Sequence, residues 1–311
     1  MEKTIAFMGT PQIAADVLQS LIDAGANISL VITQPDRPVG RKKKLTPSPV
    51  KELALKYGIP VFQPERIKKD YSVLEQAKPD LVVTCAYGQI VPQAVLDIPT
   101  YGCVNLHGSL LPEYRGAAPI QRAIWDGKKE SGMSLMQMEK GMDTGGVMDV
   151  EKITIDPSDN TTTLFEKMGK AAGRLIVRNL DALLEGEGHF EQQDPEKATY
   201  ASMISADEEK INFDLDDEQI VNQIRALSLE PGAYGLIGGK KLKILDAEYI
   251  PGSTAGKGKL LKEGRKAMSL SLSEGRLLLK RVQLEGKPAM DIAQFVNGAG
   301  QHLDGMSFSM N

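Results

Sequence analysis

Three polar residues in the middle of the chain carry side chains that suit acyl-transfer chemistry. Asn105 and His107 end the apolar run "GCVNLH" two positions apart, so the alternation of a strand points both side chains to the same side. An amide and a protonated imidazole can both donate hydrogen bonds to an oxygen that becomes negative during acyl transfer. Asp143, in the glycine-rich stretch "GMDTGG", can orient His107 or accept a proton from the nucleophile.

Spacing alone leaves two interpretations of these residues open. They can form a catalytic centre, or His107 can be a strand-end histidine that a loop aspartate holds for structural reasons.

The other histidines, His189 and His302, lie in polar or glycine-rich surroundings, and we expect both to be solvated. Cys85 and Cys103 each lie in an apolar stretch and are expected to be buried thiols, not a disulfide, a metal pair or a nucleophile.

The elements that must position these residues indicate an α/β fold. Apolar, largely β-branched runs alternate with helical patterns, as in a mostly parallel sheet that is buried on both faces. The runs are residues 4–9, 28–34, 80–86 and 102–107. Residues 11–25 predict a helix that Thr10 caps. Segments 133–139 and 147–155 flank the loop that holds Asp143 and predict a hairpin-like addition to the sheet.

Shifts in composition predict two domains. Residues 1–188 are expected to form the Rossmann-like domain, and the polar, weakly patterned residues 189–207 to form a linker. Residues 208–311 contain short alternating strands and glycine-rich turns, which favour a small β-barrel of the OB-like kind. The first turn, residues 8–11, lacks two glycines of the dinucleotide-binding motif, so no nicotinamide site is expected.

Charge is unevenly distributed along the chain. The formal net charge of -4 argues against a uniformly basic nucleic-acid binder, yet residues 36–44, "DRPVGRKKK", hold five cations and one acid.

No apolar run approaches the ~20 residues of a membrane helix, and the N-terminus lacks the pattern of a signal peptide. We therefore expect a cytoplasmic, monomeric protein with no membrane partner.

One long motif surrounds the polar residues: "HGSLLPEYRGAAPIQRAI" at 107–124, with Asn105 before it and "GMDTG" at 141–145. This combination resembles the 10-formyltetrahydrofolate-dependent formyltransferase superfamily, and the match is specific because its parts occur in the family's order. The resemblance implies that Asn105 and protonated His107 stabilise an oxyanion, while Asp143 orients His107 and assists proton removal. It also implies 10-formyltetrahydrofolate as the formyl-donor cosubstrate, no metal, and no covalent enzyme intermediate.

The same resemblance implies a folate pocket and a macromolecular acceptor. The segment 33–54 and the C-terminal domain are similar to those of family members that formylate methionine on initiator tRNA for translation initiation. Initiator methionyl-tRNA is therefore the expected acceptor. The implied folate contacts are Tyr87, Gly88, Gln89, Ile90, Ser109, Leu110, Leu111 and Pro112. The expected tRNA contacts are Arg37, Arg41, Lys42, Lys43 and Lys44.

Two other acceptors stay open at this level. A small-molecule amine formyltransferase, of the nucleotide-sugar or glycinamide ribonucleotide type, would use the same polar residues, and a formyltetrahydrofolate hydrolase would use water.

We also expect the basic segment from Pro35 to Thr46 to be irregular and mobile until tRNA binds. The reasons are that Pro35, Pro38 and Gly40 interrupt regular structure and that neighbouring cations repel one another.

Overall fold

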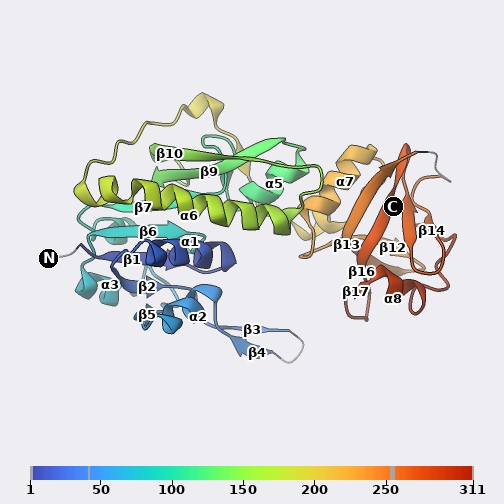
Figure 1. Cartoon of the computed structure of the whole chain (residues 1–311), viewed down its shortest axis with the longest axis horizontal. Helices are drawn as coiled ribbons and strands as arrows, with labels where there is room; N and C mark the ends of the chain where they lie inside the picture. Colours follow the sequence, from blue (N-terminus) through green and yellow to red (C-terminus); the bar gives the residue numbers. More distant parts are fainter. Residues whose placement is uncertain (1–2, 41–42, 253–255, 310–311) are drawn as a thin grey trace. The chain divides into compact units, whose positions relative to one another are not determined.

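The computed structural model describes residues 3–40, 43–252 and 256–309 of the chain, which divides into two compact units (Figure 1). The first unit comprises Met1–Pro119, Glu130–Thr154 and Phe165–Ala201, and the second comprises Ile120–Lys129, Ile155–Leu164 and Ser202–Asn311. The expected domain boundaries at residues 188 and 208 stay predictions. The segment expected to be a linker, however, groups with the first unit as far as Ala201.

A seven-stranded sheet forms the centre of the first unit. Its strands, in order across the sheet, are β10 (Val147–Thr154), β9 (Glu130–Gln137), β7 (Cys103–His107), β6 (Leu81–Cys85), β1 (Ile5–Gly9), β2 (Ile28–Ile32) and β5 (Val61–Phe62). The strands from β7 to β5 pair in parallel, whereas β9 runs antiparallel to β7 and to β10. The predicted mostly parallel sheet with an added hairpin is therefore confirmed. Strand β1 is buried throughout, which explains why its sequence is apolar without alternation.

Helices that lie between these strands or follow them along the chain pack on the sheet (Figure 1). They are α1 (Gln12–Asp23), α2 (Pro49–Lys56), α3 (Ser72–Ala77), α4 (Gln93–Leu96) and α6 (Thr161–Glu185). Helix α6 approaches α1 closely at two glycines. A Cβ on Gly169 would lie 2.6 Å from the Asp16 carboxylate, and one on Gly173 would overlap the Ser20 hydroxyl. At Gly173 the Ser20 Cβ would also lie only 2.9 Å away, so this position needs the smallest residue, whereas the flexible Asp16 carboxylate beside Gly169 can move.

The predicted cap of α1 is wrong. Pro11 takes the N-cap position, and the Thr10 hydroxyl donates instead to the Tyr87 carbonyl oxygen at 2.8 Å. Thr10 follows β1 and Tyr87 follows the neighbouring parallel strand β6, so both residues lie at the same edge of the sheet. A tertiary contact has replaced the local capping bond that the sequence favours.

The basic segment forms a β-hairpin and not an irregular loop. Strands β3 (Arg37–Val39) and β4 (Lys44–Thr46) pair antiparallel, with positive φ values of 71° at Gly40 and 46° at Lys43 between them. Pro38 lies within β3 and is tolerated there because a two-stranded ribbon leaves outward-facing positions that need no N–H donor. The expected mobility of this segment stays a prediction, and Arg41 and Lys42 lie outside the described residues.

A second short pairing joins distant parts of the first unit. Strand β8 (Arg115–Gly116) pairs in parallel with β11 (Tyr200–Ala201), which follows the 3-10 helix η1 (Pro195–Lys197). The pairing is close, since a Cβ on Gly116 would lie 2.8 Å from the Ala201 carbonyl oxygen. The polar segment that was expected to be a linker therefore packs against the SLLPxYRG turn, residues 109–116.

An antiparallel sheet dominates the second unit, as the sequence predicts. Its order is β12 (Ala233–Ile237), β13 (Lys240–Pro251), β16 (Gly275–Leu284), β15 (Met268–Ser271) and β14 (Leu260–Lys262), with β17 (Met290–Asp291) paired to β16. The helices are α5 (Pro119–Trp125), η2 (Ala206–Glu209), α7 (Asp217–Ala226) and α8 (Ile292–Val296). Strand residues that alternate inward, such as Leu277 and Leu279 of β16, build its core together with Ile220 and Ile224 of α7.

The C-terminal segment joins the two end strands of this sheet. The Ser309 N–H donates to the Leu236 carbonyl oxygen of β12 at 2.8 Å, while the Leu260 N–H of β14 donates to the Met306 carbonyl oxygen at 2.8 Å. Between these bonds, Phe308 is 2% exposed and stacks on Phe213 with a centroid separation of 5.7 Å. The segment therefore supports the barrel form that was expected for this domain.

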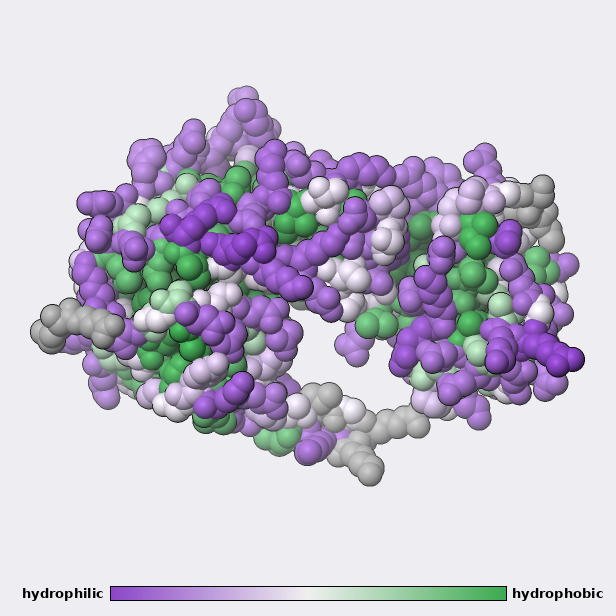
Figure 2. Space-filling view, viewed as in Figure 1, coloured by the Kyte–Doolittle hydropathy of each residue, from purple (hydrophilic) through white to green (hydrophobic). Residues whose placement is uncertain are grey.

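The described part of the chain contains no helix that is long and apolar enough to span a membrane. Hydrophilic residues cover most of the face seen in Figure 2, and hydrophobic residues show between them.

We expect Phe308→Ala to destabilise the second unit by about 3–5 kcal/mol, because a buried, stacked ring would leave a cavity. Chemical denaturation followed by circular dichroism would measure this change. Ser309→Ala is the matched control, since the Ser309 side chain is exposed and the neighbouring backbone bond is retained. Equal stability of the two variants would contradict a structural role for the C-terminal segment.

Candidate active site

The candidate site lies at the carboxyl edge of the parallel sheet, where β6 and β7 end side by side. Asn105 pairs in register with Thr84 of β6, and His107 is the last residue of β7. Asn105 is half-buried, whereas His107 is 6% exposed. Polar side chains at this edge can face a ligand because the loops that follow parallel strands open there.

Each ring nitrogen of His107 faces an oxygen. Its Nε2 lies 2.9 Å from the Tyr114 carbonyl oxygen. A carbonyl oxygen can only accept, so the Nε2–H donates to it. Its Nδ1 faces the Asp143 carboxylate, with 3.6 Å between Nδ1 and Oδ1. That separation exceeds hydrogen-bond range, so Nδ1, which carries a proton only when the ring is protonated, is not engaged by the Asp143 carboxylate.

The backbone holds Asp143 in an unusual conformation. Asp143 has a φ of +54°, in the left-handed region that few side chains adopt. Its Oδ2 accepts the Gly116 N–H at 2.8 Å, and its own carbonyl oxygen accepts the Gln193 side-chain amide at 2.8 Å. The structure thus brings together His107 and Asp143, as the sequence predicts, by contacts that the sequence did not indicate.

The SLLPxYRG turn is fixed by hydroxyl groups. The Ser109 hydroxyl donates to the Glu113 carbonyl oxygen at 2.6 Å and is fully buried, so it is a structural group and not a candidate nucleophile. The Ser134 hydroxyl donates to the Ser109 carbonyl oxygen at 2.7 Å and accepts the Leu111 N–H at 3.1 Å. Leu110, Leu111 and Pro112 are half-buried, and the Leu111–Pro112 peptide bond is cis.

Three functional candidates were missed in the sequence: Arg115, Gln193 and Thr199. The Thr199 hydroxyl accepts the Tyr114 N–H at 2.8 Å, and the Thr199 carbonyl oxygen accepts the Arg115 N–H at 2.8 Å. Arg115 is 6% exposed and donates to Gln193 Oε1. Only the arginine gave a sequence signal, as part of the YRG motif. Gln193 and Thr199 lie in a polar segment without hydrophobic periodicity. Nothing in its sequence distinguishes residues that hold the site in place from residues of a linker.

The second group of predicted folate residues follows β6 at the same edge. Tyr87 is 3% exposed, and burial raises the pKa of its hydroxyl to about 12. Gly88 has a φ of +92° and passes close to the Gln34 side chain. Gln89 Oε1 accepts the Ile67 N–H at 2.8 Å, whereas Ile90 is 91% exposed. As folate contacts these residues stay predictions.

The described cations of the hairpin are exposed. Arg37, Lys43 and Lys44 have no carboxylate at salt-bridge distance among the described residues. The nearby Asp36 carboxylate pairs with Lys51 at 2.7 Å, and this hydrogen bond lowers the pKa of Asp36. The one acid of the basic segment is therefore occupied elsewhere, which leaves the hairpin charges available to an anionic partner.

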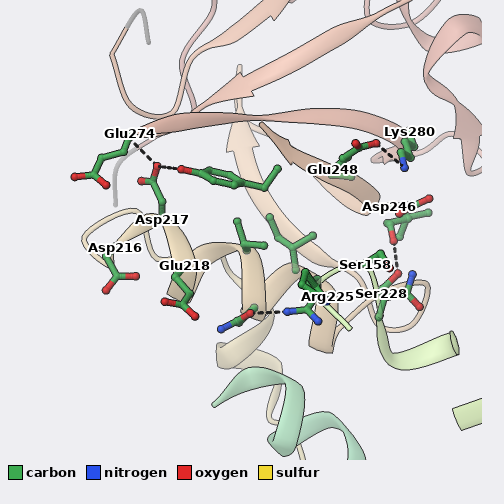
Figure 3. A pocket seen from close by; sticks show the side chains of 18 of the residues that line it. Ser158, Asp216, Asp217, Glu218, Arg225, Ser228, Asp246, Glu248, Glu274 and Lys280 are labelled. Atoms are coloured by element: carbon green, nitrogen blue, oxygen red, sulfur yellow. Dashed lines mark hydrogen bonds and ion pairs between the residues drawn. The ribbon is translucent and has the colours of Figure 1, made fainter. Parts of the chain in front are cut away.

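A cavity of about 890 Å³ lies in the second unit, between α7 and β13 (Figure 3). Six carboxylates and three cations line it, and several of these groups satisfy one another. Asp217 accepts the Ser273 and Glu274 N–H groups at 2.9 and 2.8 Å, and Lys280 pairs with Glu248 at 3.0 Å. An acidic lining repels phosphate, so this cavity is not a candidate for binding the phosphates of a nucleic acid.

The other two histidines and both cysteines have the solvent exposure that the sequence predicts. His189 and His302 are exposed, while Cys85 and Cys103 are buried free thiols. Among the described residues, no group of three or more histidine, cysteine or acidic side chains could hold a metal ion.

Comparison with known proteins identifies the family to which the sequence is similar. Residues 3–180 match the family described as formyl transferase, and residues 203–300 match the one described as formyl transferase, C-terminal domain. The chain is similar to the methionyl-tRNA formyltransferase of Listeria innocua, with 43% identity over 302 residues and 96% of each chain covered. It is also similar to that of Macrococcus caseolyticus, with 42% identity over 307 residues and 98% of each chain covered.

Solved structures share the fold at lower identity. HypX from Aquifex aeolicus has a TM-score of 0.72 at 15% identity, covering 98% of this chain and 50% of its own. An N-formyltransferase from Helicobacter canadensis, in complex with folinic acid and dTDP-3-aminofucose, has a TM-score of 0.66 at 21% identity, covering 90% of this chain and 99% of its own.

We expect iodoacetamide to leave Cys85 and Cys103 unmodified in the folded protein at about pH 8.5, the ordinary pKa of a free thiol. Burial raises the pKa of both thiols to about 12, so both are protonated and inaccessible. Mass spectrometry would detect the adducts, and the protein unfolded in guanidinium is the control in which both cysteines react. Rapid labelling of the folded protein would show that these thiols are accessible and would contradict the expected burial.

Proposed function

The chain belongs to the formyl transferase family, and on that basis we propose that it transfers the formyl group of 10-formyltetrahydrofolate to the α-amine of methionine on initiator tRNA. One observation carries the choice of acceptor. The relatives named methionyl-tRNA formyltransferase share 43% and 42% identity over 302 and 307 residues, so the similarity includes both units. Water or an amine without phosphate groups would give the basic hairpin no anionic partner.

Asn105 and His107 supply the hydrogen-bond donors of the proposed reaction. The His107 Nε2–H is used by the Tyr114 carbonyl oxygen, so the Nδ1–H of the protonated ring is the donor left for a substrate. The Asn105 amide lies two residues earlier on the same strand and points to the same side. When the methionine amine attacks the formyl carbon, these two donors stabilise the oxygen that becomes negative.

In the proposed reaction, Asp143 stabilises the positive charge on His107 and accepts a proton from the methionine amine. Its Oδ1, 3.6 Å from His107 Nδ1, attracts the imidazolium without consuming its hydrogen. The transfer forms a bond between the formyl carbon and the methionine nitrogen and breaks the bond to the folate nitrogen. The methionine amine must lose one proton, which the Asp143 carboxylate accepts directly or through a water, and the folate nitrogen gains one.

The folate cosubstrate is proposed to bind where the loops after β6 and β7 meet. Thr84 of β6 and Asn105 of β7 are in register, so residues 87–90 and 109–112 leave the sheet at neighbouring positions. The exposed Ile90 and the half-buried Leu110 and Pro112 provide apolar surface for a pterin ring. Ser109 contributes by fixing the turn and not by touching the reacting atoms.

The hairpin is proposed to bind phosphates near the acceptor end of the tRNA. Arg37, Lys43 and Lys44 are exposed, and Arg41 and Lys42, outside the described residues, would add two more charges. The arginine forks suit bidentate phosphate binding. The cytoplasmic location and the monomeric state expected from the sequence stay predictions.

We expect Asn105→Ala and His107→Ala each to lower the rate of methionyl-tRNA formylation by roughly 100-fold or more, because each donor acts mainly in the transition state. Formylation of methionyl-tRNA, a small amine and water would be assayed side by side, which also separates the three acceptors. His302→Ala, which changes an exposed histidine, is the control. Near-normal turnover of folded His107→Ala would show that the catalytic centre is misassigned.

Neutralising Arg41 and Lys42 to Lys44 together is expected to weaken methionyl-tRNA binding and to reduce its salt dependence. Each lost phosphate contact lowers the slope of log K against log salt by about 0.7–0.9. Folate affinity should change little. Changing Lys56, Lys68, Lys69 and Lys78 together to glutamine removes the same four charges and is the control for net charge, since these side chains are exposed outside the hairpin. An unchanged salt slope in the hairpin variant would remove the hairpin from the phosphate contacts.

A further inference from the structure

We propose that Gln193 is a positioning residue for Asp143, which it fixes through hydrogen bonds to the backbone of the Asp143 loop. The inference rests on the proposed function, since it assigns a role in the same reaction. Gln193 belongs to the polar segment that leads to β11, and it is half-buried at the side of the Asp143 loop.

The Gln193 amide group spans the Asp143 turn. Its Nε2 donates to the Asp143 carbonyl oxygen at 2.8 Å and to the Gly145 carbonyl oxygen at 2.7 Å. An NH₂ group has two hydrogens, so both donors are used. These bonds hold the carbonyl groups on either side of Thr144, and they fix the peptide that follows the left-handed Asp143.

The other end of the same amide reaches the second support of Asp143. Gln193 Oε1 accepts Arg115 Nε at 3.0 Å and Arg115 Nη2 at 2.8 Å. Arg115 directly precedes Gly116, whose N–H donates to Asp143 Oδ2 at 2.8 Å. Gln193 therefore connects the backbone of Asp143 with β8, the strand whose Gly116 N–H binds the Asp143 carboxylate. The hydrogen bonds among Gln193, Arg115, Gly116 and Asp143 thus form a closed network.

The Asp143 loop needs such a support. It has glycines at 141, 145 and 146, and Asp143 itself has a φ of +54°, so local sequence preference does not fix its conformation. The Asp143 Oδ1 lies 3.6 Å from His107 Nδ1, and a small displacement of the loop would change this separation directly. Misplacement by about 1 Å can cost on the order of 100-fold in rate.

Only an uncharged amide of this length satisfies all four contacts. Glutamate would keep the acceptor for Arg115 but would face the Asp143 and Gly145 carbonyl oxygens with a second acceptor. Asparagine is one methylene shorter and cannot reach both sides. Lysine could donate to the carbonyl groups but would leave the buried Arg115 without an acceptor and place two cations together.

The test measures how Gln193 and Asp143 depend on each other. Gln193→Met removes all four hydrogen bonds, and Gln193→Glu removes only the two to the Asp143 loop. Single-turnover formylation of methionyl-tRNA would be measured with enzyme in excess, together with the affinity for both substrates and the melting temperature. The same rates would be measured for Asp143→Ala and for Asp143→Ala with Gln193→Met.

We expect Gln193→Met and Gln193→Glu to lower the transfer rate by at least roughly ten-fold while substrate affinities change little. In the Asp143→Ala background, Gln193→Met should add no further loss, because Gln193 acts through Asp143. Additive losses, or an unchanged rate in either single variant, would overturn the proposal.

Gln223→Met is the matched control for stability. Gln223 is a buried glutamine whose Nε2, like that of the half-buried Gln193, donates to two backbone carbonyl groups, those of Glu208 and Lys210, but it lies in the second unit. A similar fall in melting temperature with a normal transfer rate is expected for it. An equal loss of rate in this control would mean that stability explains the Gln193 effect, and the proposal would fail.

The unaltered protein separates this inference from the proposed function. If the wild type does not formylate methionyl-tRNA, the proposed function fails whatever the variants do. If the wild type is active and the Gln193 variants match it, only the positioning role fails.

Discussion

One hydrogen bond joins the three parts of the chain on which the candidate site depends. The Gly116 N–H donates to Asp143 Oδ2 at 2.8 Å, and the same carboxylate faces His107 through Oδ1. Because Gly116 belongs to β8 and β8 pairs with β11, the direction of this carboxylate depends on Tyr200 and Ala201, far along the chain. A glycine-rich loop alone could not hold Asp143 there, since its residues can adopt many conformations of similar energy.

The parallel sheet supplies the second half of the site by simple geometry. Adjacent parallel strands end at the same edge, so the loops after β6 and β7 converge there. Asn105 and His107 share a side because they alternate along β7, and burial of the surrounding strands keeps β7 rigid. The Thr10 hydroxyl, which donates to the Tyr87 carbonyl oxygen and caps no helix, ties the loop after β1 to the same edge.

Two surfaces of the protein differ in charge. The hairpin from Arg37 to Thr46 carries cations, and its nearest acid, Asp36, is paired with Lys51. The cavity beside α7 has the opposite character, with six carboxylates against three cations. An anionic substrate would be attracted by the first surface and repelled by the second, so the distribution of charge supports the proposed tRNA contact at the hairpin better than the net charge does.

The sequence by itself determined the fold class, the hairpin added to the sheet, the burial of both cysteines and the identity of Asn105, His107 and Asp143 as candidates. These features follow from hydrophobic periodicity and from a contiguous motif, which are properties of neighbouring residues. Only the tertiary structure decided that Thr10 caps no helix, that residues 37–46 pair as strands and that Gln193 and Thr199 support the site. Each of these depends on contacts between distant segments, and the energy of a long-range hydrogen bond leaves no periodic trace in the sequence.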